Sequence, residues 1–184
     1  PYRPGSSIRS LIDEGVLSRS FQELTSTHLP LDRPLYSHQE KSIRKVSSGR
    51  NVIVATGTGS GKTESFLLPI LDSLTKEKDG DTLGPGVRAL LLYPMNALAN
   101  DQLKRLRKLL ADYPDITFGR YTGDTVQDKA KAIELFKELN IDEPILPNEL
   151  LSRDEMRESP PNILLTNYAM LEYLLLRPED TSLF

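Results

Sequence analysis

The chain contains no cysteine, and its two histidines, His28 and His38, lie apart in the sequence. The absence of cysteine excludes disulfides and thiolate metal sites within these 184 residues, and two separate histidines cannot complete a zinc site alone. No apolar run approaches the roughly 20 residues that cross a bilayer, and the opening PYRPGSSIRS lacks a signal-peptide core. We therefore expect an intracellular, cytoplasmic protein.

Charge of one sign is not in large excess. The net charge is −3 and 27% of the residues are charged, so composition indicates an ordinary water-exposed surface and names no partner. A length of 184 residues suits one α/β domain with a core of its own and is short for two. Because the sequence begins with Pro1 rather than Met and stops at Phe184, we expect an excerpt of a longer protein.

A glycine-rich stretch, TGTGSGKT at residues 56–63, follows four consecutive apolar residues and precedes a helical apolar pattern. The run at 52–55 predicts a strand buried on both faces of a parallel sheet, and the spacing of apolar residues over 66–74 predicts a helix. The glycines therefore lie at a strand-to-helix turn, the position of a phosphate-binding loop.

The residue types of this loop suit a nucleoside triphosphate with Mg²⁺. Glycines bend the backbone so that successive N–H groups and the helix N-terminus face an anion. Lys62 is expected at the β- and γ-phosphates and Thr63 on the Mg²⁺, which makes them the catalytic pair, with Thr63 the metal ligand. The expected loop contacts are Thr56, Gly57, Thr58, Gly59, Ser60, Gly61, Lys62, Thr63 and Glu64. Thr56 stands where the GxxxxGK(S/T) pattern has glycine, and the alternative is a glycine-rich turn that binds nothing.

Ahead of the loop, the segment Tyr36-Ser37-His38-Gln39 leads into a helix that Gly49 ends. The carboxamide of Gln39 offers a donor and an acceptor to the N6 and N7 edge of adenine, and Tyr36 can pack against the same base. The alternative is that Gln39 is an exposed, solvated side chain near a helix start.

Apolar patterns elsewhere predict alternating strands and helices, and thus an α/β fold with a parallel sheet flanked by helices. Strands are expected over residues 87–93, 116–121 and 162–166, and helices over 7–17, 97–110, 126–139 and 169–176. Residues 1–34 are expected to form a helical arm that packs on the domain formed by residues 35–184.

Two charged segments separate the strands. The helix at 97–110 turns Leu103, Leu106 and Leu110 inward and Lys104, Arg105, Arg107 and Lys108 outward, either as a solvated face or along a phosphate backbone. Residues 124–160 form an acidic helical insert, with ten Asp and Glu against five Lys and Arg, so the net charge there is −5 and +2 elsewhere. Nucleic acid is expected to avoid this insert.

The order of the motifs YSHQ, TGTGSGKT, YPMNALANDQ, YTGD and LLTNYAMLE resembles the first RecA-like motor domain of superfamily 2 DExx-box helicases, over residues 34–177. The resemblance assigns Gln39 to adenine recognition and residues 57–63 to motif I. It implies ATP and Mg²⁺ as cofactors, nucleic acid as partner, and a second RecA-like domain. By the same resemblance, the nucleic-acid contacts are Pro94, Met95, Asn96, Thr122, Gly123, Thr166, Asn167 and Tyr168.

Both backbone-holding segments follow the carboxyl ends of predicted parallel strands, where open α/β sheets bind ligands. We therefore expect the nucleic acid and the nucleotide to share one edge of the sheet. The alternatives are an ordinary strand-to-helix turn for residues 94–102 and a helix-capping role for Thr166. The wording of the motifs is most similar to large bacterial and archaeal helicases, related to repair and phage-defence enzymes, that often end in a zinc-binding domain. This favours DNA over RNA.

The acidic pair of a DExx motor is not recognisable in the sequence. Asp142-Glu143 and Asp154-Glu155 follow no apolar strand and are expected to be surface acids. By resemblance the true pair comes after Phe184, which places the end of this chain before the Walker B strand. We therefore expect ATP binding without hydrolysis by this chain alone. Two alternative functions are an RNA helicase and a nucleotide-switch binding module, although the guanine-reading NKxD is absent.

Overall fold

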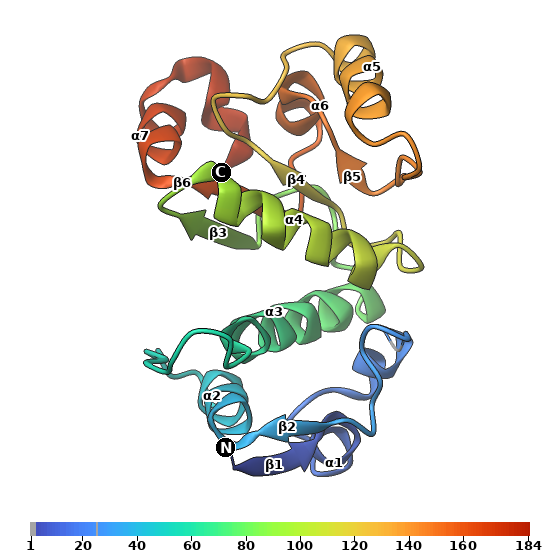
Figure 1. Cartoon of the computed structure of the whole chain (residues 1–184), viewed down its shortest axis with the longest axis vertical. Helices are drawn as coiled ribbons and strands as arrows, with labels where there is room; N and C mark the ends of the chain where they lie inside the picture. Colours follow the sequence, from blue (N-terminus) through green and yellow to red (C-terminus); the bar gives the residue numbers. More distant parts are fainter. Residues whose placement is uncertain (1–2, 25) are drawn as a thin grey trace. The chain divides into compact units, whose positions relative to one another are not determined.

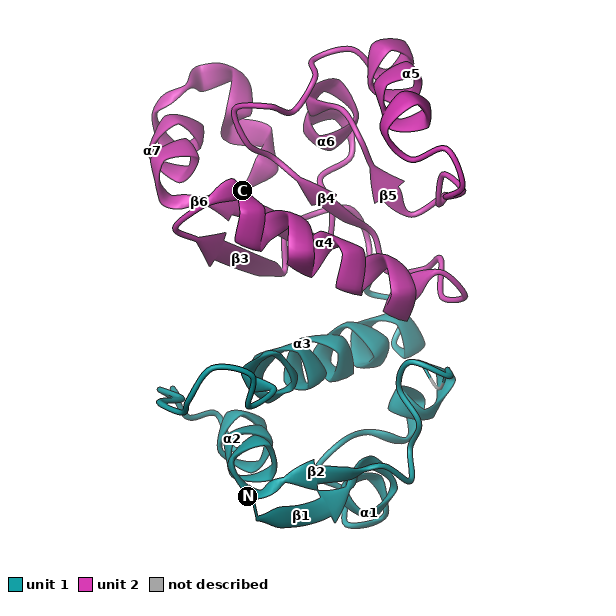
Figure 2. Cartoon of the chain, in the orientation of Figure 1, with its two compact units in different colours: residues 1–83 teal, residues 84–184 magenta. Residues whose placement is uncertain are grey.

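The chain divides after Leu83 into two units, residues 1–83 and residues 84–184 (Figure 1, Figure 2). The structure is a computed structural model that describes residues 3–24 and 26–184. None of the helices in these residues is both long and apolar enough to cross a bilayer.

Unit 1 begins with a two-stranded antiparallel ribbon and a short helix. Strand β1 (Pro4–Ser7) pairs with β2 (Pro34–Tyr36), and the Ser7 side chain caps α1 (Ile8–Asp13) by accepting from the Ser10 N–H. The helix predicted over residues 7–17 ends early because Gly15 adopts φ 74°, and its N–H bonds back to Ile12. A 3₁₀ helix, η1 (Arg19–Leu24), follows.

Two longer helices complete unit 1, α2 (Ser37–Ser47) and α3 (Lys62–Asp79). Pro69 lies inside α3 and has no N–H to donate to the Ser65 carbonyl. That carbonyl instead accepts from the Ser42 hydroxyl of α2 at 3.0 Å, so the proline leaves no unsatisfied group and joins the two helices. Asp72 of α3 accepts from the N–H and hydroxyl of Ser18, both at 2.7 Å, which ties the N-terminal segment to the same helix.

The strand predicted over Val52–Ala55 is wrong for this structure. The segment is irregular, its residues alternate between half-buried and exposed, and Ile53 is 96% exposed. A strand requires a neighbour to satisfy its N–H and C=O groups. No described strand pairs with these residues, so their apolar character alone does not produce a strand.

Unit 2 is built on a parallel sheet with the strand order β3-β6-β4-β5, which confirms the predicted α/β class with helices flanking the sheet. Its strands are β3 (Ala89–Tyr93), β4 (Phe118–Arg120), β5 (Glu149–Leu150) and β6 (Ile163–Asn167). The central strand β6 is buried from Ile163 to Thr166 and pairs on both sides. The three longer strands were expected, whereas β5 is too short to give an apolar pattern.

Five helical segments complete unit 2, namely α4 (Asn96–Leu110), α5 (Lys129–Leu139), α6 (Arg153–Glu158), α7 (Tyr168–Leu176) and η2 (Pro178–Leu183). In Figure 1, α4 runs across the strands β3, β6 and β4. The helix predicted from residue 126 begins later because Asp128 caps it by accepting from the Lys131 N–H.

The prediction that Arg107 points outward from α4 is wrong. Arg107 is 8% exposed, pairs with the buried Glu149 and with Glu143, and donates to the Pro144 carbonyl at 2.5 Å. Its guanidinium also lies 4.7 Å from the centre of the Phe136 ring. Arg107 therefore anchors the acidic insert to α4, while Lys104 and Lys108 stay exposed.

Candidate nucleotide and nucleic-acid sites

The phosphate loop of unit 1 has a backbone that requires glycine at two positions. Gly59 and Gly61 adopt φ 74° and 72°, in the left-handed region that other residues rarely enter. Gly61 is also the N-cap residue of α3, and no side chain caps this helix end, so the first N–H groups of an 18-residue helix can receive an anion.

Lys62 folds back over the loop. Its Nζ donates to the carbonyl of Thr56 at 2.9 Å and to that of Gly57 at 2.7 Å. These are neutral acceptors, which a phosphate can replace with stronger charge-assisted bonds. The Thr56 hydroxyl, at the position where the motif has glycine, contacts the buried Ser60 hydroxyl at 2.6 Å and so closes the loop from within.

The remaining loop residues differ in exposure. Thr58 is exposed with Gly57 and Gly59, and Thr63 is half-buried in the first turn of α3. A hydroxyl at Thr63 suits a Mg²⁺ that also binds phosphate oxygens, because Mg²⁺ takes oxygen ligands and keeps several waters. The described residues contain no cluster of three or more His, Asp or Glu side chains that could hold a metal ion. A Mg²⁺ at this loop would therefore need the oxygens of a bound phosphate as ligands.

Gln39 is 3% exposed, so the alternative of a solvated glutamine is wrong. Its Oε1 accepts from the Tyr36 N–H at 2.7 Å, and its Nε2 donates to the Gly61 carbonyl at 2.7 Å. The structure thus brings the predicted adenine-reading residue to the phosphate loop, 22 residues away in sequence. Tyr36 is exposed and stacks on His38, with ring centres 5.8 Å apart.

The second group of predicted residues lies at the carboxyl ends of three parallel strands of unit 2. Asn167, which ends β6, donates to the Asn96 side chain at 2.7 Å, and Asn96 donates to Asp124 at 2.9 Å. Asn96 begins α4 after the short link Pro94-Met95 that follows β3, and Asp124 follows β4. The three motif segments are therefore joined side chain to side chain at one edge of the sheet.

Thr166 and Thr122 are fully buried at this edge. The Thr166 hydroxyl donates to the Tyr121 carbonyl at 2.6 Å, whereas Asn167 caps α7 by accepting from the Met170 N–H. The helix-capping alternative for Thr166 is therefore wrong, because the cap is the next residue. Thr122 donates its N–H to the Thr125 hydroxyl at 2.9 Å.

The exposed members of the group are Pro94, Met95, Gly123 and Tyr168, of which Tyr168 is 66% exposed. Met95 precedes α4 and gives it no side-chain cap, so the N–H groups of its first turn are open to a phosphate oxygen. At this edge, buried residues hold the loops in place. The exposed residues and the N-terminus of α4 can contact the sugar-phosphate backbone of a nucleic acid.

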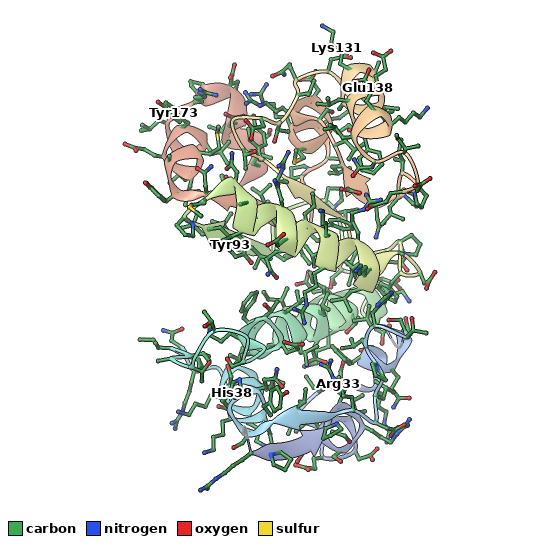
Figure 3. The ribbon with its side chains drawn as sticks, in the orientation of Figure 1. Arg33, His38, Tyr93, Lys131, Glu138 and Tyr173 are labelled. Atoms are coloured by element: carbon green, nitrogen blue, oxygen red, sulfur yellow. The ribbon has the colours of Figure 1, made fainter. Side chains whose placement is uncertain are left out.

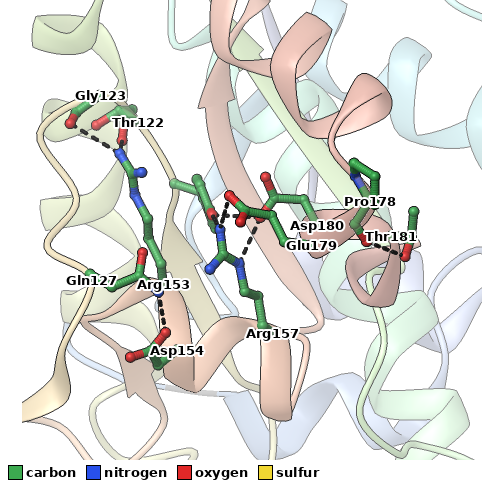
Figure 4. Close-up of polar contacts among 11 residues, drawn as sticks. Thr122, Gly123, Gln127, Arg153, Asp154, Arg157, Pro178, Glu179, Asp180 and Thr181 are labelled. Atoms are coloured by element: carbon green, nitrogen blue, oxygen red, sulfur yellow. Dashed lines mark hydrogen bonds and ion pairs between the residues drawn. The ribbon is translucent and has the colours of Figure 1, made fainter.

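One residue at this edge was missed by the sequence analysis. Arg153, in the acidic insert, donates to the carbonyls of Thr122 at 3.2 Å and Gly123 at 3.1 Å (Figure 4). Its guanidinium also lies 5.3 Å from the Tyr121 ring centre. The local sequence SRDE signals a helix cap and gives no sign of this contact. A cation of the insert therefore supports the loop after β4.

Tyr121 is fixed by Asp180 and Arg157. Its hydroxyl donates to Asp180 at 2.6 Å, and Arg157 donates to the Tyr121 oxygen at 2.9 Å. Arg157 also donates to Asp180 at 2.8 Å (Figure 4). Burial, and then the bond to Asp180, raise the pKa of Tyr121 to about 12. Nearby, burial lowers the pKa of Arg120, which contacts Asn100 of α4.

The carboxylates of the two candidate acidic pairs are exposed, or they bond to nearby cations and to a helix cap. Asp142 and Glu143 are exposed, and Glu143 pairs with Arg107. Glu155 accepts from Ser152 in the cap of α6 and pairs with Lys129 at 3.0 Å, while Asp154 is exposed. Three of the four carboxylates are exposed, as expected of surface acids. The fourth, Glu155, is half-buried because it belongs to a helix cap.

A parallel α/β sheet with loops at its carboxyl edge, in a chain with a glycine-rich loop ahead of a helix, defines the RecA-like class of P-loop folds. The model of the DEAD/DEAH box helicase family matches residues 36–179, and the chain belongs to that family. This confirms the resemblance to superfamily 2 helicases and the RecA-like fold.

Two curated relatives show how far the similarity reaches. The chain is 30% identical, along its whole length, to Druantia protein DruE of Escherichia coli, and 30% identical over 141 residues to the ATP-dependent helicase Lhr-Core of Methanothermobacter thermautotrophicus. It spans 14% and 15% of the lengths of these proteins.

Solved structures agree. DUF1998 helicase MrfA bound to DNA and AMPPNP is 25% identical, covers 99% of this chain with a TM-score of 0.66, and is matched over 20% of its own length. DEAD-box helicase Mss116 bound to ssRNA and UDP-BeF is 22% identical, covers 96% of this chain with a TM-score of 0.61, and is matched over 31% of its own length. The Mss116 likeness supports the fold.

Proposed function

We propose that this chain is the ATP-binding part of the first motor domain of an ATP-dependent DNA helicase or translocase. The observation that carries the proposal is the chain of side-chain hydrogen bonds from Asn167 through Asn96 to Asp124, which joins the three nucleic-acid motifs at one sheet edge. The built phosphate loop with Gln39 against it supplies the nucleotide half.

The residues have distinct roles in this proposal. Lys62 and the α3 N-terminus would hold the phosphates of ATP, Thr63 would give one oxygen ligand to Mg²⁺, and Gln39 with Tyr36 would hold adenine. Met95, Asn96, Gly123 and Tyr168 contact the sugar-phosphate backbone of one strand together with Pro94, without reading bases. The bound Mg²⁺ supplies charge neutralisation at the phosphates.

We propose that the residues that activate the attacking water, and the surface that closes over the bound ATP, lie outside these residues. A second RecA-like domain is the proposed partner, because ATP-driven closure of two such domains moves a strand. Lacking a suitable acidic pair among its described strands, the chain by itself is proposed to bind ATP without robust turnover.

DNA is favoured over RNA because MrfA, which is 25% identical to this chain, is described in complex with DNA. RNA remains the second candidate, since backbone contacts alone do not report the 2′-hydroxyl. A nucleotide switch is the third candidate function, and a preference for guanine nucleotides would identify it.

The test measures fluorescent nucleotide binding and the fluorescence anisotropy of labelled strands on the purified chain. We expect Mg²⁺-dependent ATP binding, and binding of single-stranded DNA that falls as salt rises. A matched RNA strand that competes better than DNA would reassign the substrate, and preference for GTP would favour the switch. Robust ATP hydrolysis by the chain alone would show that its catalytic acids lie within these residues.

A further inference from the structure

The loop after β4, residues 122–125, is a tight turn that is closed at its base and open at its tip. The Thr122 N–H donates to the Thr125 hydroxyl at 2.9 Å, and the Thr125 N–H donates to the Thr122 carbonyl at 3.1 Å. Both threonines are buried, whereas Gly123 and Asp124 at the tip are exposed. A Cβ added to Gly123 would meet no atom within 4 Å, so the space beside the tip is open to a ligand.

Arg153 holds this loop from the side of the acidic insert. Its Nη2 donates to both the Thr122 and the Gly123 carbonyl (Figure 4). The Arg153 N–H donates to the Val126 carbonyl at 2.9 Å, which ties its backbone to the residue that follows the loop. The guanidinium also lies against the ring of Tyr121, the residue that precedes the loop. Arg153 is thus half-buried and bonded on both sides of the loop tip.

The bonds from Arg153 set the direction of two peptide groups. In a trans peptide, the C=O and the N–H of the next residue point to opposite sides. Because Thr122 and Gly123 turn their carbonyls toward Arg153, the N–H groups of Gly123 and Asp124 point away from it. Neither N–H group makes a hydrogen bond with another described residue. A cation on the carbonyl oxygens also polarises the peptide groups, so the loop tip presents two adjacent, strengthened donors to an anion.

The place of the tip on the sheet edge fits a phosphate of a bound strand. Asp124 accepts from Asn96 at 2.9 Å, which joins the tip to the N-terminus of α4, where further N–H groups are open. The Asp124 carboxylate would oppose a phosphate, and Arg153 brings the opposite charge to the same loop. The insert, although its net charge is negative, therefore supplies a cation at the edge.

We propose that Arg153 is a positioning residue for nucleic-acid binding, which holds the loop at 122–125 so that the N–H groups of Gly123 and Asp124 donate to one phosphate of the bound strand. This inference rests on the proposed nucleic-acid function. It gives the acidic insert a part in strand binding through a residue that contacts the loop and not the strand.

The first experiment measures the fluorescence anisotropy of a labelled single-stranded DNA with variants of the chain. Arg153→Gln removes the charge and the paired bonds to the two carbonyls, so we expect the DNA affinity to fall about tenfold. Arg153→Lys keeps the charge and a donor, and should restore part of the affinity. Lys131→Gln, at an exposed lysine of α5 that is labelled in Figure 3, removes the same charge from the insert and should leave the affinity nearly unchanged.

The second experiment observes the two N–H groups directly by nuclear magnetic resonance of the isotope-labelled chain. Addition of the same DNA should shift the amide proton signals of Gly123 and Asp124, because a phosphate oxygen accepts from them. In Arg153→Gln, both shifts should be smaller at a DNA concentration that saturates the variant. A residue that only stabilised the fold would leave these shifts unchanged. Thermal unfolding followed by circular dichroism checks that each variant is folded.

Equal DNA affinity of Arg153→Gln and the unchanged chain overturns the inference while DNA binding stands. An equal loss in Lys131→Gln also overturns it, because net charge alone would then account for the effect. If Arg153→Gln does not fold, Arg153→Lys and the unchanged chain carry the test, and Gly123 and Asp124 signals that do not move when DNA binds overturn the inference. Absence of DNA binding by the unchanged chain overturns the proposed function and the inference with it.

Discussion

The phosphate loop of unit 1 is one uninterrupted stretch, residues 56–63, whereas the sheet edge of unit 2 joins segments as distant as Asn96 and Asn167, 71 residues apart. In the loop, Lys62 bonds to carbonyls of its own segment. At the edge, the motif side chains bond to one another and to the backbone of neighbouring strands. The first region can therefore lose a ligand group without losing its fold, and the second region cannot.

The largest effect is expected from Lys62→Ala. The ammonium group makes two bonds to neutral carbonyls at the surface, so stability should change little, whereas loss of a charge-assisted phosphate contact should weaken ATP binding about 100-fold. Fluorescent nucleotide titration measures the affinity, and thermal unfolding measures stability. Lys41→Ala, an exposed lysine on α2, is the matched control. Unchanged ATP affinity in Lys62→Ala would contradict the loop assignment.

At the sheet edge, Thr166→Val should act on the fold first. It keeps the shape of the side chain but leaves the Tyr121 carbonyl without the Thr166 hydroxyl in a fully buried position, which should cost about 2 kcal/mol in the free energy of unfolding. Urea unfolding measures it, with single-stranded DNA binding as the second readout. Thr181→Val removes the same kind of bond, from hydroxyl to the Pro178 carbonyl, at an exposed position and is the control. Equal costs in the two variants would remove the contrast between regions.

A smaller effect is expected from the bond between Asn96 and Asn167. In a double-mutant cycle with alanine at each position, the coupling in the free energy of unfolding should be about 1 kcal/mol. Each single variant should also weaken DNA binding, because Asn96 begins α4 and Asn167 caps α7. Additive effects on stability and on DNA affinity would mean that the motif segments do not act together.

The sequence predicted well those parts whose signal is local. Strand β6 with its flanking helix α7, and the α4 helix after β3, follow from apolar runs and periodicity, and the glycine turn follows from the motif itself. The prediction of a strand over residues 52–55 was wrong because a strand needs a neighbouring strand to pair with, and an apolar run does not specify one.

The candidate site was recoverable to the same degree. The motifs identified Asn96, Asn167 and Gln39 as site residues. They did not indicate that Gln39 is buried, or that it bonds to Glu64, which in turn accepts from Arg33. Long-range side-chain partners have no sequence period. A basic helix face likewise predicted an outward Arg107, since its buried partner Glu149 lies on a strand too short to be recognised.

The smallest expected effect concerns a long-range contact inside unit 1 and asks whether the loop is independent of the N-terminal segment. Glu40 accepts from the Ser6 N–H at 2.7 Å, and this bond, opposed by burial and aided by Arg44, lowers the pKa of Glu40. Because the folded pKa lies below the unfolded value of about 4.3, the stabilisation is complete above that value and is lost as the pH falls through the folded pKa.

Glu40→Gln should therefore lower the free energy of unfolding by less than about 1 kcal/mol at pH 7, and the pH-dependent part of this difference should disappear in acid. Urea unfolding at a series of pH values measures it. ATP affinity at pH 7 should be unchanged, since Glu40 contacts Ser6 and Arg44 and belongs to no loop contact. A parallel loss of ATP affinity would show that the contact between Ser6 and Glu40 supports the phosphate loop in addition to the bond from Gln39 to Gly61.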